Sequence, residues 1–240
     1  MRRETQNILL VLLGGALLKI GITGDYLQYV KPAQLPWVLA GGGVMVALGA
    51  VAILRDIRAH ARQPAGLEAN TAHHGHHHPA RSAWLLLLPV LAVFLVAPPA
   101  LGADSVARTE ARAPAPASAA FPPLPGGAVV PLSLTEFVTR AGWDSGGSLN
   151  GKTVQLTGFV THAHGSILLA RMVITCCAAD AYPLTVRLTG PATPAYPDDT
   201  WLRVTGQAVP GTASSANRYT PDLTVTAVDR ITQPPDPYED

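Results

Sequence analysis

A run of 20 residues without a charged side chain, Leu35 to Leu54, constrains this chain more than any other feature. At 1.5 Å per residue, an α-helix of that length spans about 30 Å, the thickness of the hydrocarbon core of a bilayer. Two further apolar stretches, Ile8 to Tyr26 and Ala83 to Leu101, flank it. We therefore predict three transmembrane helices, over residues 8–26, 35–54 and 83–101, in a membrane region that covers residues 1–102.

The positive charges of the short loops predict how these helices are oriented. Two arginines precede the first helix, and four lie in the loop of residues 55–82. Because Lys and Arg are enriched in cytoplasmic loops, we expect the N-terminus and this loop inside the cell. Three crossings of the plasma membrane then place everything after Leu101 outside the cytoplasm. A signal-peptide-like segment over residues 81–102 is the alternative, and it leaves the same part outside.

The part after the membrane region has the pattern of a small all-β domain. Residues 103–127 are rich in Ala and Pro and are expected to form an extended extracytoplasmic linker. In the domain of residues 128–240, Ser133 and Glu136 have the spacing of a capping box and predict a short helix. Five alternating segments predict strands, and these are Thr153–Thr161, Ile167–Thr175, Leu184–Leu188, Trp201–Val209 and Leu223–Ile231. With Gly158 and Gly206 where a sheet could coil, the pattern favours an OB-like barrel, with a β-sandwich as the alternative.

The two cysteines of the chain, Cys176 and Cys177, are adjacent, and Asp180 follows them closely. Neighbouring residues of a regular strand point to opposite faces, so both thiols converge only where the chain leaves the strand. Outside the cytosol, such a pair can form a strained vicinal disulfide, bind a soft metal together with the Asp180 carboxylate, or pack as small hydrophobes. The sequence leaves these three alternatives open.

A histidine tract lies in the predicted cytoplasmic loop. Five imidazoles fall within six consecutive positions, and they belong to His73, His74, His76, His77 and His78. Imidazole binds divalent transition metals such as zinc, so the tract is a candidate metal site; low-complexity drift without a role is the alternative. His162 and His164 are separated from the cysteines by a whole predicted strand, and we expect them to be exposed turn histidines.

One side of the second predicted helix carries small residues at helical spacing, namely Ala40, Gly43, Ala47 and Ala50. Helices in a bilayer approach one another closely through such stripes. We therefore expect this small-residue stripe to contact either the first helix of the chain or a second membrane protein.

Composition and motifs exclude several classes of function. A net charge of +1, with 14% charged residues, provides no basic surface for nucleic acid. The sequence contains no Ser-His-Asp order, no P-loop, no dinucleotide fingerprint and no pair of carboxylates in an apolar setting. We therefore do not expect an enzyme.

Several short motifs carry a resemblance to a known family. They are Arg3-Glu4-Thr5-Gln6, Tyr29-Val30-Lys31-Pro32, the run Val173-Ile174-Thr175-Cys176-Cys177-Ala178-Ala179-Asp180-Ala181, the segment Asp199 to Gly206, and Pro235-Asp236-Pro237-Tyr238. Through them the chain resembles the YcgQ-like family of bacterial two-component permease accessory subunits, whose C-terminal domain of unknown function has a Cys-Cys-Ala-Ala-Asp motif. The resemblance implies a larger multi-spanning permease as partner, and it transfers Cys176 and Cys177, with Asp180, as the suspected site.

Together, these observations predict a membrane-anchored accessory subunit that contacts lipid and a permease, with metal-ion transport or handling as its role. No cofactor is certain, and zinc or a similar divalent ion is the candidate. The alternative is a membrane-anchored thiol redox protein that acts through Cys176 and Cys177. The two differ because a redox protein cycles between dithiol and disulfide without a permease partner.

Overall fold

A computed structural model describes residues 3–61, 88, 91, 95, 99–111, 121–163, 165–193 and 195–239 of the chain. The chain divides into two compact units. The first unit comprises Met1–Tyr26 and Pro32–Pro99, and the second comprises Leu27–Lys31 and Ala100–Asp240. The histidine tract lies outside the described residues, as does His164.

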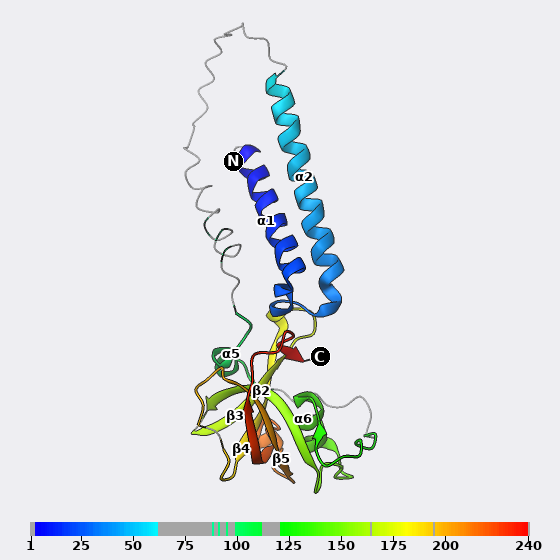
Figure 1. The fold of residues 1–240 in the computed structure, drawn as a ribbon, viewed down its shortest axis with the longest axis vertical. Coiled ribbons are helices and arrows are strands. Elements are labelled where there is room, and N and C mark those ends of the chain that lie inside the picture. Colours follow the sequence, from blue (N-terminus) through cyan, green and yellow to red (C-terminus); the bar gives the residue numbers. More distant parts are fainter. Residues whose placement is uncertain are drawn as a thin grey trace. The chain divides into compact units, whose positions relative to one another are not determined.

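The first unit is helical, with α1 (Arg3–Thr23) and α2 (Leu35–Ala61) side by side (Figure 1). Two short 3-10 helices, η1 (Asp25–Gln28) and η2 (Pro32–Gln34), lie between them in the chain. α1 ends three residues before its predicted end, because Gly24 adopts a left-handed conformation with a φ of 88° that terminates the helix. α2 continues seven residues beyond Leu54, through a stretch without Gly or Pro.

Two helices in the described part of the chain are long and apolar enough to cross a membrane. Their apolar windows are Gln6–Thr23 and Pro32–Ala59, and only 11% of each window is buried within the protein, unlike a core helix of a soluble domain. The third predicted helix, over residues 83–101, falls mostly outside the described residues. Leu88, Leu91 and Leu95 are helical there. The two described helices suggest a membrane anchor.

Glycines bring α1 and α2 into close contact. A Cβ atom on Gly14 would lie 2.8 Å from the carbonyl oxygen of Gly42, and one on Gly49 would lie 2.5 Å from a methyl group of Val11. At one end of the pair, the Asn7 amide donates to the Asp56 carboxylate over 3.2 Å. The two helices are therefore antiparallel and pack through small residues, as helices in lipid commonly do.

The second unit contains a seven-stranded mixed sheet. Its strands are β1 (Val130–Pro131), β2 (Thr153–Ala163), β3 (Ser166–Val173), β4 (Tyr182–Thr189), β5 (Trp201–Val209), β6 (Asp222–Arg230) and β7 (Tyr238–Glu239). The five long strands agree with the five predicted ones to within two residues at every end. The strand order is β1-β2-β5-β6-β4-β3-β7, and β2 also pairs with β3. The pairings of the five long strands therefore form a closed circuit in which β4 and β6 are parallel and the other neighbours antiparallel.

The two glycines noted in the sequence allow neighbouring strands to approach closely. Gly158 pairs with Leu202, and a Cβ atom there would lie 2.6 Å from the carbonyl oxygen of Ala170. Gly206 stands at a register shift between β5 and β6, where a Cβ atom would overlap the carbonyl oxygen of Thr224. A side chain at either position would collide with backbone of a neighbouring strand.

The main core lies between the sheet and α6 (Leu134–Trp143), which lies beside the strands (Figure 1). Ser133 caps α6 by accepting a hydrogen bond from the Glu136 amide over 3.0 Å, as predicted. The helix buries Leu134, Phe137 and Val138 completely. Alternate residues of the strands complete this core, among them Val154, Leu156, Leu169, Val186, Leu202, Val204 and Leu223.

A second, smaller cluster covers the other face of the sheet. Phe159, Met172 and Trp201 pack there with Tyr238 and with α5 (Ala103–Arg108). The prediction of an extended linker over residues 103–127 is therefore wrong for its first six residues. Residues 103–108 form a helix because Ala103 is buried and its amide donates to the Asp199 carboxylate over 2.6 Å.

Candidate functional site

The chain leaves β3 immediately before the two cysteines, as their convergence requires. β3 ends at Val173, and Cys176 and Cys177 precede the single turn η3 (Ala178–Asp180). The Asp180 carboxylate folds back on the loop and accepts hydrogen bonds from the amides of Thr175, over 2.7 Å, and Cys176, over 2.8 Å. These two hydrogen bonds bring Asp180 back against the start of the loop and so close it.

A second chain segment holds the backbone of the cysteines from another side. Val30, in the short segment Leu27–Lys31, forms an isolated antiparallel bridge with Cys177. The Lys31 amide donates to the Cys176 carbonyl over 3.3 Å, and the Ala178 amide donates to the Tyr29 carbonyl over 2.7 Å. The Cys176-Cys177 dipeptide thus lies between Asp180 and a segment almost 150 positions earlier in the sequence, to which it is joined by an isolated bridge.

The two sulfur atoms are placed as a pair of metal ligands would be. The Sγ atoms of Cys176 and Cys177 are 3.6 Å apart, and both cysteines are free thiols. Two sulfurs about 2.3 Å from one tetrahedral zinc ion lie about 3.8 Å apart. The ligand atoms of the two cysteines and Asp180 all lie within 4.8 Å of one another. Cys176 and Asp180 are exposed and Cys177 is half-buried, so an ion can reach this Cys-Cys-Asp site from solvent.

The carboxylate and the thiol shift each other's protonation in opposite directions. Hydrogen bonding to the Asp180 carboxylate, followed by hydrogen bonding to Cys177, raises the pKa of Cys176 from its ordinary value of 9.0 to about 11. The pKa of Asp180 is lowered, first by its hydrogen bond with Cys176 and then by the Thr175 amide. Near neutral pH, Asp180 is therefore ionised and Cys176 carries its proton.

The C-terminal segment supports the site, and its residues are not among the site residues predicted from the sequence. β7 pairs in parallel with the end of β3, and the Tyr238 hydroxyl donates to the Gln28 carbonyl over 2.8 Å and accepts from the Leu101 amide over 3.1 Å. The Arg171 guanidinium binds three carbonyl oxygens of this segment, those of Asp236, Pro237 and Tyr238. The resemblance of the Pro-Asp-Pro-Tyr ending to the family was the one available signal.

Glu239 completes this support at the N-terminus of α6. Its carboxylate accepts hydrogen bonds from the amides of Leu134, over 2.8 Å, and Thr135, over 2.7 Å, and from the Thr135 hydroxyl. Its own carbonyl accepts from the amide of Ile174, two residues before the cysteines. A negative charge at a helix N-terminus is stabilised by the unpaired amides and the helix dipole. The last strand therefore connects α6 to the start of the cysteine loop.

His162 does not join the cysteines. The His162 Nδ1 atom lies 2.7 Å from the Asp198 carboxylate, and the ring is about half exposed. Among the described residues, the group of metal-ligating atoms contains Cys176, Cys177 and Asp180, and His162 takes no part in it. The five histidines of the tract lie outside the described residues.

The small-residue stripe of α2 does not face α1. Gly42 and Gly49 make that contact and are buried, whereas Ala40, Ala47 and Ala50 are exposed. A Cβ atom on Gly43 would have no neighbour within 4 Å. Within the described residues, the stripe therefore remains uncovered by the chain's own helix.

Comparison with known proteins assigns both parts of the chain to one family. Residues 5–111 match the DUF1980 N-terminal domain, and residues 144–239 match the DUF1980 C-terminal domain. No curated protein and no solved structure matches the chain. The C-terminal match includes Cys176, Cys177 and Asp180 as well as the segment that supports them. The chain therefore belongs to the DUF1980 family, of which it contains both domains.

Proposed function

We propose that this protein is the membrane-anchored accessory subunit of a two-component permease and that it binds the transported metal ion through Cys176, Cys177 and Asp180. The observation that carries the proposal is that the two thiol sulfurs lie 3.6 Å apart, within reach of solvent and beside a carboxylate. Two sulfurs and one oxygen suit zinc and similar borderline ions. The role is binding and delivery, with no covalent chemistry on a substrate.

An incomplete set of ligands favours transfer over permanent binding. Structural zinc sites have four protein ligands, whereas sites that exchange ligands keep a position open. The Cys-Cys-Asp site supplies three donor groups at the surface of the second unit, and a fourth position can be filled by water or by a ligand of the receiving protein. An ion held in this way is accessible to a partner.

The raised pKa of Cys176 favours metal binding over the redox alternative. The thiolate is the nucleophile of thiol–disulfide exchange, and a thiol with a pKa of about 11 is almost entirely protonated near neutral pH. A vicinal disulfide would also strain the dipeptide, which is held in place by the hydrogen bonds from Lys31 to the Cys176 carbonyl and from Ala178 to the Tyr29 carbonyl. A metal ion, in contrast, displaces the proton with its own charge.

The architecture we propose is an OB-like barrel carried outside the cytoplasm by three membrane helices. The closed circuit β2-β5-β6-β4-β3 supports the barrel, because closure removes the exposed edges of a small sheet. The two described apolar helices support the anchor, and the arginine-rich loop of residues 55–82 supports a cytoplasmic N-terminus.

The partner we propose is a multi-spanning permease that contacts the small-residue stripe of α2. In the two described spans, Lys19 is the one charged residue well within the apolar region, which is too few polar groups for a conduction path. The stripe Ala40, Gly43, Ala47 and Ala50 is uncovered by α1 and small enough for close approach of another helix.

Cadmium titration of the full-length protein in detergent tests the metal site. The charge-transfer absorption between thiolate and cadmium reports sulfur ligands and does not report the imidazoles of the histidine tract. We expect saturable binding, loss of the absorption in the Cys176→Ser/Cys177→Ser variant, and at least tenfold weaker binding in Asp180→Asn. Ala179→Ser, a change at an exposed position of the same loop, is the matched control and leaves the affinity unchanged.

The pH dependence of the same titration is a second readout. Cadmium must displace the Cys176 proton, whose pKa of about 11 lies above the whole working range. The apparent affinity therefore rises at least about tenfold per pH unit between about pH 6 and pH 8. A flat profile, or an unchanged absorption in the double cysteine variant, contradicts metal binding at this site.

A further inference from the structure

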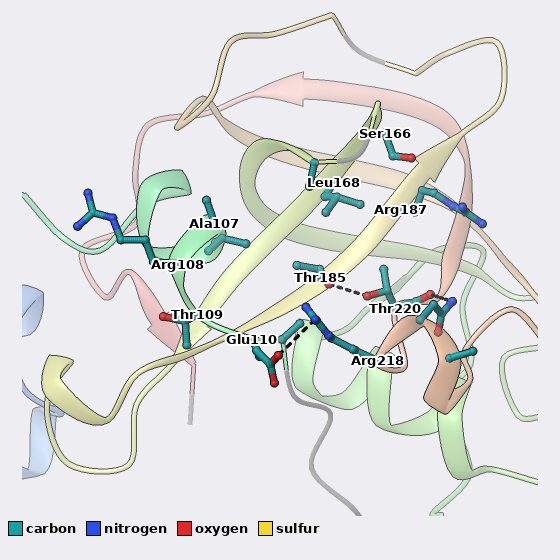
Figure 2. Close-up of a pocket in the computed structure, with 15 residues that line it drawn as sticks. Ala107, Arg108, Thr109, Glu110, Ser166, Leu168, Thr185, Arg187, Arg218 and Thr220 are labelled. Atoms are coloured by element: carbon teal, nitrogen blue, oxygen red, sulfur yellow. Dashed lines mark hydrogen bonds and ion pairs between the residues drawn. The ribbon is translucent and has the colours of Figure 1, made fainter.

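A cavity of about 630 Å³ lies in the second unit (Figure 2). Its lining residues are different from those of the cysteine loop. One wall is formed by the end of α5 and the residues that follow it to Ala111, and another by the turn η4 (Ser215–Asn217) and the residues after it. β3 and β4 form the floor. Its volume lies in the range of about 300 to 1,000 Å³ that is usual for small-molecule sites.

The wall that contains η4 includes two residues in an unusual backbone conformation. Arg218 and Tyr219 are consecutive non-glycine residues with left-handed φ values of 55° and 58°. The Asn217 side chain holds this turn by donating to the carbonyls of Thr212 and Thr220, while its oxygen accepts from the Ser214 amide. The Tyr219 ring stacks on Trp143 of α6, with 4.4 Å between ring centroids. Strained conformations held by surrounding contacts concentrate at ligand sites.

This turn directs Arg218 toward the cavity, where the guanidinium meets a carboxylate of the chain itself. Figure 2 shows the side chains of Arg218 and Glu110 pointing toward each other, and the two are 3.3 Å apart. Both side chains are more than half exposed, so this ion pair contributes little stability and is readily exchanged. Arg187, in contrast, is engaged by Asp222 through two hydrogen bonds of 2.7 and 2.6 Å. Arg108, a third arginine of the lining, pairs with Asp104 of its own helix over 2.8 Å. Of the three arginines, Arg218 is the one whose partner, Glu110, also lines the cavity, so an incoming anion can bind Arg218 by displacing Glu110.

The floor of the cavity offers both hydroxyl groups and an apolar surface. The hydroxyls of Thr185 and Thr220 are 2.8 Å apart, and Thr185 is buried (Figure 2). Ser166 and the half-buried Leu168 also line the cavity. We propose that this cavity binds a small organic anion whose carboxylate or phosphate group replaces Glu110 on Arg218 while its body rests on Leu168 and the threonines.

Calorimetric titration of the full-length protein in detergent, in a buffer free of phosphate, tests this proposal. Succinate and inorganic phosphate are the probes, and glycerol is the uncharged control. We expect saturable binding of at least one anion and none of glycerol. Arg218→Gln is expected to weaken binding at least tenfold, whereas Glu110→Gln, which removes the internal competitor, is expected to tighten it severalfold. The stronger of the two probes identifies carboxylate or phosphate as the recognised group.

Arg203→Gln is the matched control, because Arg203 is exposed on β5 and is not part of the cavity lining. Opposite effects of the Arg218 and Glu110 variants, with no effect of Arg203→Gln, support the proposal. It is overturned if neither anion binds to the wild type and the Glu110→Gln variant, or if Arg218→Gln binds as the wild type does. An equal loss in the Arg203 and Arg218 variants also overturns it, since that result reports net charge alone.

Discussion

Asp180 is the residue on which the chemistry of the cysteine loop depends. Its carboxylate closes the loop through the amides of Thr175 and Cys176, and it also accounts for the largest part of the upward shift in the pKa of Cys176. The same group thus closes the loop, is a candidate metal ligand and raises the pKa of the neighbouring thiol. In the proposed function, this carboxylate lowers the fraction of thiolate on an exposed cysteine until an ion binds.

We predict that Asp180→Asn makes Cys176 more reactive toward alkylation while it weakens cadmium binding. Removal of the carboxylate lowers the pKa of Cys176 toward its ordinary value of 9.0, so more thiolate is present at pH 8. Because nucleophilicity falls with the pKa, the expected gain in rate is about tenfold. Iodoacetamide labelling with fragment mass spectrometry distinguishes Cys176 from Cys177. Asp198→Asn is the control, and an unchanged rate in Asp180→Asn would contradict the assigned cause.

Among the structural elements, β2 shows most clearly how one residue shapes the sheet. Gly158 stands where β2 is paired with β5 and passes close to β3, and its missing side chain admits the Ala170 carbonyl. We predict that Gly158→Ala destabilises the second unit by about 1 to 3 kcal/mol, because the backbone of β3 must move. Denaturant unfolding followed by near-ultraviolet circular dichroism measures this change. Gly126→Ala, at an open position, is expected to have little effect.

The two faces of α2 differ in what they contact. Gly42 and Gly49 pack against α1, whereas the stripe that includes Gly43 is open. We predict that Gly43→Leu weakens the complex with the proposed permease partner by about 1 to 3 kcal/mol, through loss of close helix packing, and that co-purification reports this loss. Gly41→Leu is the matched control, since Gly41 is also open but lies on another side of the helix. Equal retention of the partner by both variants would show that the stripe is not the contact.

For the whole molecule, the main feature is how distant segments converge on the cysteine loop. The segment Leu27–Lys31, the loop itself and the C-terminal strand β7 belong to one compact unit, although they come from opposite ends of the chain. The Tyr238 hydroxyl joins two of these regions through the carbonyl of Gln28, 210 positions away, and the amide of Leu101. The position of the segment at the cysteines therefore depends on the last residues of the chain.

We predict that Tyr238→Phe loosens the segment around the cysteines without unfolding the sheet. The change leaves the Gln28 carbonyl and the Leu101 amide without their partner, a loss of about 1 to 3 kcal/mol. Hydrogen exchange by mass spectrometry is expected to be faster in peptides that contain Lys31 and Ala178, whose amides bind across this contact. Tyr196→Phe, at a half-buried position on the main core, serves as the control. Unchanged exchange in Tyr238→Phe would show that the hydroxyl does not hold this segment at the cysteine loop.

The sequence by itself determined the five long strands, α6 and the two described apolar helices of this protein. The charge-free run of α2, the alternation in β2 and β5, and the Ser133 cap of α6 are local patterns, and local patterns specify helix length, strand boundaries and helix starts. The end of β3 before Cys176 was also predicted, to within two residues, whereas convergence of the two thiols was one of several alternatives. The start of the linker was not predicted, since α5 exists through burial of Ala103 and the distant carboxylate of Asp199.

Only the tertiary structure decided how the site is held and where a second one lies. The bridge from Val30 to Cys177, the clasp of Arg171 on the C-terminal segment and the approach of Arg218 to Glu110 all join residues more than 60 positions apart. No periodicity in the sequence encodes such contacts, because they arise from the register of the strands and the closing of the sheet. The cysteine motif thus identified a candidate site in advance, whereas the raised pKa of Cys176 and the anion cavity became visible only once the strands were paired.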